Sequence, residues 1–167
     1  MVWLVMMAAA LGGEPEPEVQ GAWMVVRKTH PMEDTPQVMA VTQETAPSGL
    51  RPISLAVGCD YPDLIVGMMS GSGILAEKYS DTRVAIRIRV DAEEPRPVTV
   101  HRVHPALHFP DGAAIIAAME TGSRLTVDAP VAGRGRTYPT FDLTGIDRIA
   151  PMLREICAPP EPEPVEE

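Results

Sequence analysis

The chain contains two cysteines, Cys59 and Cys157, and their wide separation constrains the fold more than any other feature. Only one intramolecular pairing exists, and it would tie the middle of the chain to its last structured turn. In the chain-entropy model, closing such a loop contributes about 4–5 kcal/mol to stability. The pair therefore predicts a disulfide-stabilised domain in an oxidising compartment. Two buried free thiols are the alternative, and a redox pair is not expected because no Cys-x-x-Cys spacing is present.

Composition limits the class of protein and of partner. A chain of 167 residues with 45% hydrophobic and 4% aromatic residues fits one domain with an aliphatic core. The net charge of −9 argues against binding to nucleic acid, whose phosphates require basic surfaces. Much of this charge lies in glutamates near the two ends: Glu14, Glu16, Glu18, Glu161, Glu163, Glu166 and Glu167. The body is thus close to neutral, so electrostatic steering of partners should be weak.

The two ends predict export and extended tails. Residues 1–12 are apolar and uncharged, and they are too short to span a bilayer. They are typical of the apolar part of a secretory signal, with Ala10 and Gly12 as the small residues before a cleavage site; a buried N-terminal segment is the alternative. Residues 13–22 and 158–167 are rich in Glu and Pro, which predicts a solvated linker and a disordered acidic tail. The globular domain is expected over residues 23–157, with no stable membrane span in the mature chain.

Short apolar runs between turn residues predict a domain of mostly β structure. The clearest is 83–91, in which Val and Ile alternate with arginines, as in a half-buried strand whose arginines face solvent. The other expected strands are 23–27, 37–42, 52–57, 63–69, 98–103, 124–127 and 137–143, and residues 70–73 should form a tight turn.

Two helices are expected late in the chain. The first spans 111–120, with Asp111 as its N-cap and the apolar residues Ala113, Ile116, Ala117 and Met119 near helical spacing. The second follows Gly145 and carries an apolar stripe that leads to Cys157. Pro151 predicts a kink or a later start in this helix. The fold class is therefore mostly β and β-sandwich-like with two late helices, and α+β is the alternative.

Several groups of reactive side chains are weak candidates for chemistry. His101, His104 and His108 do not share one face if the segment is a strand, and the remaining histidine, His30, is distant in sequence. The acids Glu33, Asp34, Asp60 and Asp63 are expected to cap turns or to be solvated. Ser72 lies in a glycine turn without a nucleophile-elbow pattern. Residues 133–136, which read Gly-Arg-Gly-Arg, predict a basic turn, although they could hold an anion. No catalytic residue, metal or cofactor is therefore expected, and the side chains singled out are the disulfide pair Cys59 and Cys157.

The closing segment 141–157 is the most distinctive part of the sequence, with Phe-Asp-Leu-Thr-Gly followed by an expected helix and Cys157. The landmarks before it are Trp23, Pro31, Asp34, Val38, the segment 49–59 ending in Cys59, the strand 84–91, Phe109-Pro110, Gly112, Gly122 and Leu125. Taken in order, these landmarks resemble the TagO/VasI-like family of exported bacterial proteins associated with type VI secretion, and the closing segment carries the resemblance most strongly. The resemblance implies an accessory protein of the cell envelope without established catalysis.

Together these observations predict a periplasmic or exported protein that is not an enzyme and that binds a protein partner in the envelope or in a secretion assembly. Two other functions remain open. One is a metal-dependent or hydrolytic envelope enzyme, and the other is a protein that contacts host cells or the cell surface. The sequence does not predict the oligomeric state.

Overall fold

The computed structural model describes residues 16–29, 32, 34–46, 52–60, 62–70, 83–103, 106–131 and 135–158. The expected leader at residues 1–12, the turn at residues 71–73 and the tail from residue 159 onward lie outside these ranges.

The strands form one antiparallel sheet. They are β1 (Glu18–Gln20), β2 (Trp23–Thr29), β3 (Pro36–Gln43), β4 (Ile53–Asp60), β5 (Asp63–Ser70), β6 (Arg83–Val90), β7 (Arg96–Val103), β8 (Ala106–His108), β9 (Arg124–Val131), β10 (Gly135–Thr137) and β11 (Thr140–Asp142). Their order in the sheet is β1-β2-β3-β4-β5-β8-β7-β6-β9-β10, and β11 also pairs with β9.

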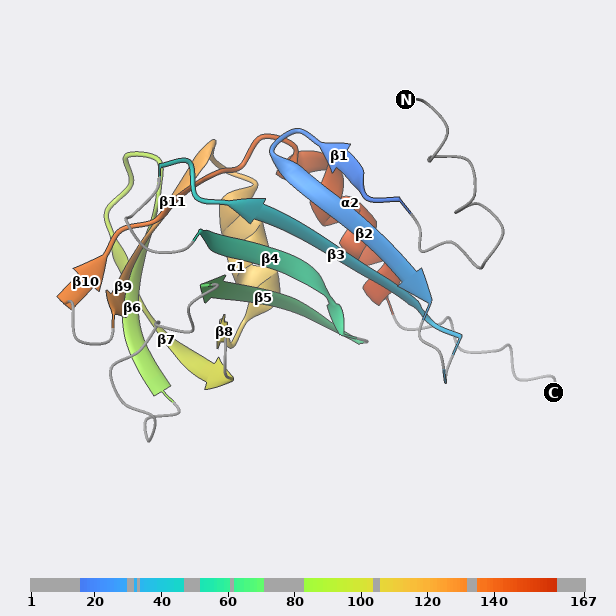
Figure 1. Ribbon diagram of the computed structural model, residues 1–167, viewed down its shortest axis with the longest axis horizontal. Helices are drawn as coiled ribbons and strands as arrows, with labels where there is room; N and C mark the ends of the chain where they lie inside the picture. Colours follow the sequence, from blue (N-terminus) through green and yellow to red (C-terminus); the bar gives the residue numbers. More distant parts are fainter. Residues whose placement is uncertain are drawn as a thin grey trace, which may run out of the picture.

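The sheet is strongly curled, so that β11 lies beside the C-terminal end of β3 (Figure 1). Just after β3, Glu44 forms a bridge with Phe141 of β11, and the Thr45 N–H donates to the Thr140 carbonyl at 2.8 Å. The mostly-β class with two late helices is confirmed. The strands, however, form one continuous curled sheet, whereas a sandwich-like arrangement of two sheets was expected.

The helices α1 (Gly112–Met119) and α2 (Ile146–Cys157) contact the same inner face of this sheet (Figure 1). As predicted, Asp111 caps α1, and its carboxylate accepts from the Ala114 N–H at 2.9 Å. The residues of α1 that turn inward are Gly112, Ile115, Ile116 and Met119. Ala113 and Ala117, expected on the apolar stripe, are exposed instead, because the helix rotates to bury Ile115.

The second helix follows Gly145 as predicted, since α2 begins at Ile146 and runs through Pro151. Of the two alternatives that Pro151 suggested, a kink or a later start, the later start is therefore wrong. The Arg148 and Ile149 N–H groups both donate to the Gly145 carbonyl, at 3.1 and 3.3 Å. Pro151 has no N–H for the carbonyl of Asp147. Both residues are exposed, so water can satisfy that carbonyl and the helix continues.

A single aliphatic core fills the space between the sheet and the helices. Its largest fully buried side chains are Trp23, Phe141, Ile53, Leu55, Met68, Ile86, Ile88, Leu107, Ile116, Met119, Leu125 and Leu143. Strands from both halves of the chain contribute to this cluster, which makes one domain.

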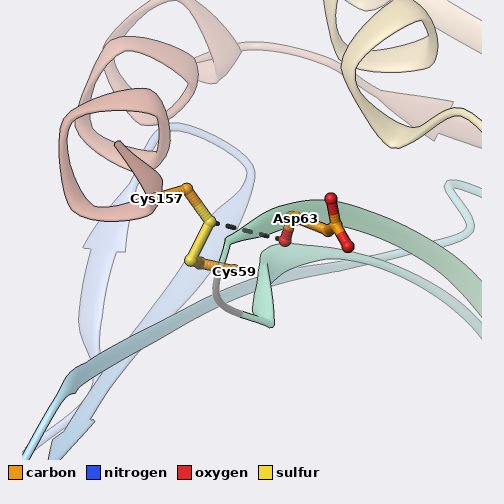
Figure 2. The surroundings of a disulfide bond; sticks show 3 residues. All are labelled: Cys59, Asp63 and Cys157. Carbon is orange, nitrogen blue, oxygen red and sulfur yellow. Dashed lines mark hydrogen bonds between the residues drawn. A yellow bond between two sulfur atoms is a disulfide. The ribbon is translucent and has the colours of Figure 1, made fainter. Parts of the chain in front are cut away.

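The disulfide between Cys59 and Cys157 joins the end of β4 to the last turn of α2 (Figure 2). The Cα atoms are 5.7 Å apart, within the range that disulfides span. The Cys157 Sγ lies 3.4 Å from the Asp63 carbonyl oxygen. A disulfide sulfur carries no proton to donate, so this is a packing contact. The pairing expected from the sequence is present, and it indicates an oxidising environment outside the cytoplasm.

The segment expected to be a linker contains part of the fold. Glu18–Gln20 form β1, which pairs with β2 through the register Glu18↔Val25 and Gln20↔Trp23. Glu18 also forms an ion pair with Arg27 at 3.5 Å. The folded domain therefore begins before Trp23, because the backbone of this short strand is satisfied by the edge of β2. Neither helix in the described ranges is long and apolar enough to cross a membrane.

Candidate functional site

The outer face of β6 carries a row of arginines. Val84, Ile86, Ile88 and Val90 are buried, whereas Arg83, Ala85, Arg87 and Arg89 are exposed. This is the alternation predicted from the sequence, and it follows from the two-residue period of a strand. Because the inner positions anchor β6 in the core, the arginines are held on a rigid support.

Asp128 of β9 lies opposite Arg87 and accepts hydrogen bonds from two arginines. Arg87 donates from Nε and Nη2 to Oδ2 of Asp128, at 2.9 and 2.5 Å. Arg136 of β10 donates from Nε to Oδ1 of Asp128, and from Nη2 to the Asp128 carbonyl at 2.9 Å. We call Arg87, Asp128 and Arg136 the Asp128 cluster. The Asp128 side chain is only 9% exposed, whereas those of Arg87 and Arg136 are 58% and 41% exposed.

The charge of Asp128 is maintained by its partners. Burial alone would raise the pKa of this carboxyl. The hydrogen bonds and positive charges of Arg136 and Arg87 outweigh burial and hold the pKa below its ordinary value. The carboxylate is therefore ionised at neutral pH and fixes both guanidinium groups in place.

Two shallow hollows flank the Asp128 cluster. One, of about 190 Å³, is lined by Arg87, Ile88, Arg89, Pro95, Thr126, Asp128 and Tyr138. The other, of about 390 Å³, is lined by Ala85, Ile86, Arg87, Pro97, Asp128 and Arg136. Arg87 and Asp128 line both, so the cluster separates two adjoining depressions on the same face of the sheet.

Two prolines shape this face. Pro130 of β9 has no N–H for a ladder, and the β6–β9 pairing covers only Arg87–Val90 against Leu125–Asp128. Arg136 of β10 is the Cα partner of Pro130. The strand expected over 137–143 is divided at Tyr138 and Pro139, where the Pro139 carbonyl instead accepts from the Val127 N–H at 3.0 Å.

The histidines occupy a different part of the sheet. His101 on β7 and His108 on β8 are Cα partners, and Arg83 on β6 is the next partner in the row. His101 is exposed and His108 is half-buried. His30 and His104 lie outside the described residues. Within the described ranges, no three His, Cys, Asp or Glu side chains are grouped so that they could hold a metal ion.

The other groups that the sequence singled out are dispersed. Asp60 and Asp63 are exposed Cα partners at the β4–β5 turn, and Asp34 has a φ of 53°. Glu33, Ser72, Gly133 and Arg134 lie outside the described residues. A basic turn was predicted over residues 133–136. The prediction is wrong for Gly135 and Arg136, which belong to strand β10.

A third hollow, which is apolar and has a volume of about 480 Å³, lies on the outer face of β2–β5. Val26, Met39, Gly58 and Ile65 form one row of Cα partners across it, and Gly58 leaves its centre without a side chain. Met39 is 44% exposed here, whereas Met68 is fully buried.

Sequence reasoning missed Asp128 and Tyr138. The alternation in β6 predicted exposed arginines, but nothing in the sequence places β9 beside β6 or Arg136 within reach of Asp128. These contacts depend on pairing register between strands that are distant in the chain, and a local period does not encode that register.

No family model matches the chain, and neither does any curated protein. Among solved structures, the invasion associated protein B of Bartonella henselae matches with a TM-score of 0.56 and 16% sequence identity. The match covers 84% of this chain and 96% of that chain. At this identity the likeness shows a shared fold only. The resemblance to the TagO/VasI-like family stays a prediction.

Proposed function

We propose that this chain is an exported binding protein of the bacterial envelope, which holds an anionic partner against the Asp128 cluster and performs no catalysis. The observation that carries the proposal is the pair of exposed arginines, Arg87 and Arg136, fixed around one buried carboxylate. A buried acid that orders two exposed cations prepares them for an external anion, because their side-chain entropy is already reduced.

The disulfide supports the location. A bond between Cys59 and Cys157 persists in the periplasm or outside the cell, where thiols are not kept reduced. The predicted leader at residues 1–12 agrees with the same route. An accessory role in a type VI secretion assembly, with a protein partner in the envelope, is the specific setting that the family resemblance favours.

Contact with host cells is the second candidate setting. It is favoured by the fold shared with a protein whose name associates it with invasion. Both settings use the same anion-binding face, so they differ in the partner and share the surface that we propose.

Charge reversal on this face tests the proposal. Arg89→Glu reverses an exposed charge beside the Asp128 cluster without removing a partner of Asp128. Arg148→Glu makes the same change at an exposed position on α2 and serves as the control. Strains carrying each variant would be scored for secretion and for host-cell association. Loss of either phenotype with Arg89→Glu but not with Arg148→Glu is expected, whereas equal behaviour of the two variants would exclude this face.

Thiol accessibility tests the location independently. Cell fractions would be alkylated before and after reduction, and the mass of the protein would be measured. We expect a periplasmic or extracellular protein whose cysteines react only after reduction. A cytoplasmic protein with two reactive thiols would contradict export.

A further inference from the structure

Tyr138 is an aromatic neighbour of the Asp128 cluster, because it lines the smaller hollow together with Arg87 and Asp128. Tyr138 is 60% exposed, whereas Trp23, Phe109 and Phe141, the other aromatic residues in the described ranges, are buried. Tyr138 lines the smaller hollow together with Pro95, Arg89 and Thr126. An exposed tyrosine on a rigid sheet offers a flat apolar face and a hydroxyl at little cost in conformational entropy.

The two hollows together have unused hydrogen-bonding capacity. Arg87 and Arg136 bind Asp128 through Nε and Nη2, and within the described residues Nη1 of neither arginine makes a hydrogen bond. Three arginines and one aspartate line the two hollows, which leaves two positive charges uncompensated. These guanidinium edges suit a carboxylate or a sulfate, which accept two parallel N–H groups.

An aromatic face beside ordered guanidinium groups matches the chemistry of an acidic sugar. The C–H groups on one side of a pyranose ring pack on an aromatic ring, and its carboxylate or sulfate accepts from arginine. We propose that the two hollows bind neighbouring units of an acidic saccharide, with Tyr138 under one ring and with Arg87, Arg89 and Arg136 on its anionic groups. This inference rests on the proposed function and names the ligand class of the same site.

The shape of the site favours a saccharide over an acidic peptide. The hollows are shallow, adjoin each other and share Arg87 and Asp128, which suits a chain of rings with regularly spaced charges. A peptide held mainly by its charges would gain little from Tyr138. The contribution of Tyr138 therefore separates the two classes of ligand.

The test measures binding of the purified, oxidised protein to fluorescent heparin oligosaccharides and to unsulfated polygalacturonate oligomers. Neutral dextran and polyglutamate are the comparison ligands. We expect binding to one or both acidic saccharides, weakening with added salt. Tyr138→Ala should weaken this binding roughly threefold to tenfold, the range of an aromatic packing contact. Tyr138→Phe should retain it, and Arg148→Ala should leave it unchanged. Preference for heparin would point to a sulfated host glycan, and preference for polygalacturonate to a uronate-rich polymer.

Three outcomes would overturn the inference. One is the absence of binding to both acidic saccharides, and another is equal binding of polyglutamate. The third is a Tyr138→Ala variant that binds like the wild type. If the saccharides fail while Arg89→Glu still abolishes the cellular phenotype, the anion-binding function stands and only the ligand class is wrong.

Discussion

Gly21 and Gly145 abut each other where the β1–β2 turn meets the start of α2. Both have positive φ, 61° and 99°, and a Cβ on Gly145 would lie 2.5 Å from the Gln20 carbonyl oxygen. A Cβ on Gly21 would lie 2.1 Å from the Thr144 carbonyl oxygen, which accepts from the Ala22 N–H at 2.9 Å. The contact therefore has no room for a side chain on either residue.

This contact gives a structural reason for the Phe-Asp-Leu-Thr-Gly segment. Phe141 and Leu143 are buried in the core. The Asp142 carboxylate accepts from the Thr144 N–H at 2.8 Å and shapes the turn, which Gly145 completes. The segment that most strongly carried the family resemblance thus has a structural role, which is to pack the N-terminal hairpin against the start of α2.

Alanine at Gly21 should destabilise the domain strongly. The substitution adds the strain of a positive φ, about 1 kcal/mol, to a clash with a backbone carbonyl that cannot move freely. We expect a total loss of roughly 3 kcal/mol or more in the free energy of unfolding, measured by urea denaturation.

Gly135→Ala is the matched control for this effect. Gly135 also has a positive φ, 81°, but no atom of the described residues lies within 4 Å of the added Cβ. This variant should lose only the strain, about 1 kcal/mol. Equal losses in the two variants would mean that the contact between the hairpin and α2 is not tight.

Reduction of the disulfide should lower the free energy of unfolding by up to about 4–5 kcal/mol, because Cys59 and Cys157 are 98 residues apart. The measurement is urea denaturation with and without a reductant. The Cys59→Ser/Cys157→Ser double variant should already have the lower stability and should not respond to the reductant. A wild-type protein equally stable in both conditions would contradict a stabilising role for the bond.

Asp128→Asn should destabilise the outer face of the sheet. Both carboxylate oxygens of Asp128 accept from arginines, so an amide NH₂ in place of one oxygen opposes a donor to a donor. We expect a loss of about 1–3 kcal/mol in the free energy of unfolding.

Glu120→Gln provides the comparison, since Glu120 accepts from Arg154 in a more exposed pair that joins the two helices. Exposed pairs contribute about 0–1 kcal/mol, so this variant should lose less. If Asp128→Asn is as stable as Glu120→Gln, the Asp128 cluster contributes no more than an ordinary surface ion pair. The proposal that Asp128 orders the two arginines would then be wrong.

Local sequence patterns predicted most of the helices and strands, whereas the candidate site depends on pairing between strands that are distant in the chain. The alternation in β6 and the Asp111 cap were readable because the signal lies within one strand or one turn. Glu18–Gln20 were misassigned because a Glu/Pro composition favours solvation unless an edge strand such as β2 is available. The role of Asp128 could not be predicted from the sequence, because it depends on contacts with Arg87 and Arg136, which lie 41 and 8 residues away in the chain.

The stability of the domain should fall in acid. Hydrogen bonds from the Ser123 backbone and side chain lower the pKa of Asp91, and those from Thr144 lower the pKa of Asp142. Burial would raise the pKa of Asp128, but its two arginines outweigh this and lower it. A pKa that is lower in the folded state gives stability that is complete above the unfolded value, about 3.9, and is lost as pH falls through the folded value. The free energy of unfolding should therefore be nearly constant from about pH 7 to pH 5 and decline below that. Urea denaturation at a series of pH values measures this profile.

Asp128→Asn should flatten the decline in acid, because the amide that it introduces cannot titrate. An unchanged acid profile in this variant would show that the Asp128 cluster does not contribute to the decline.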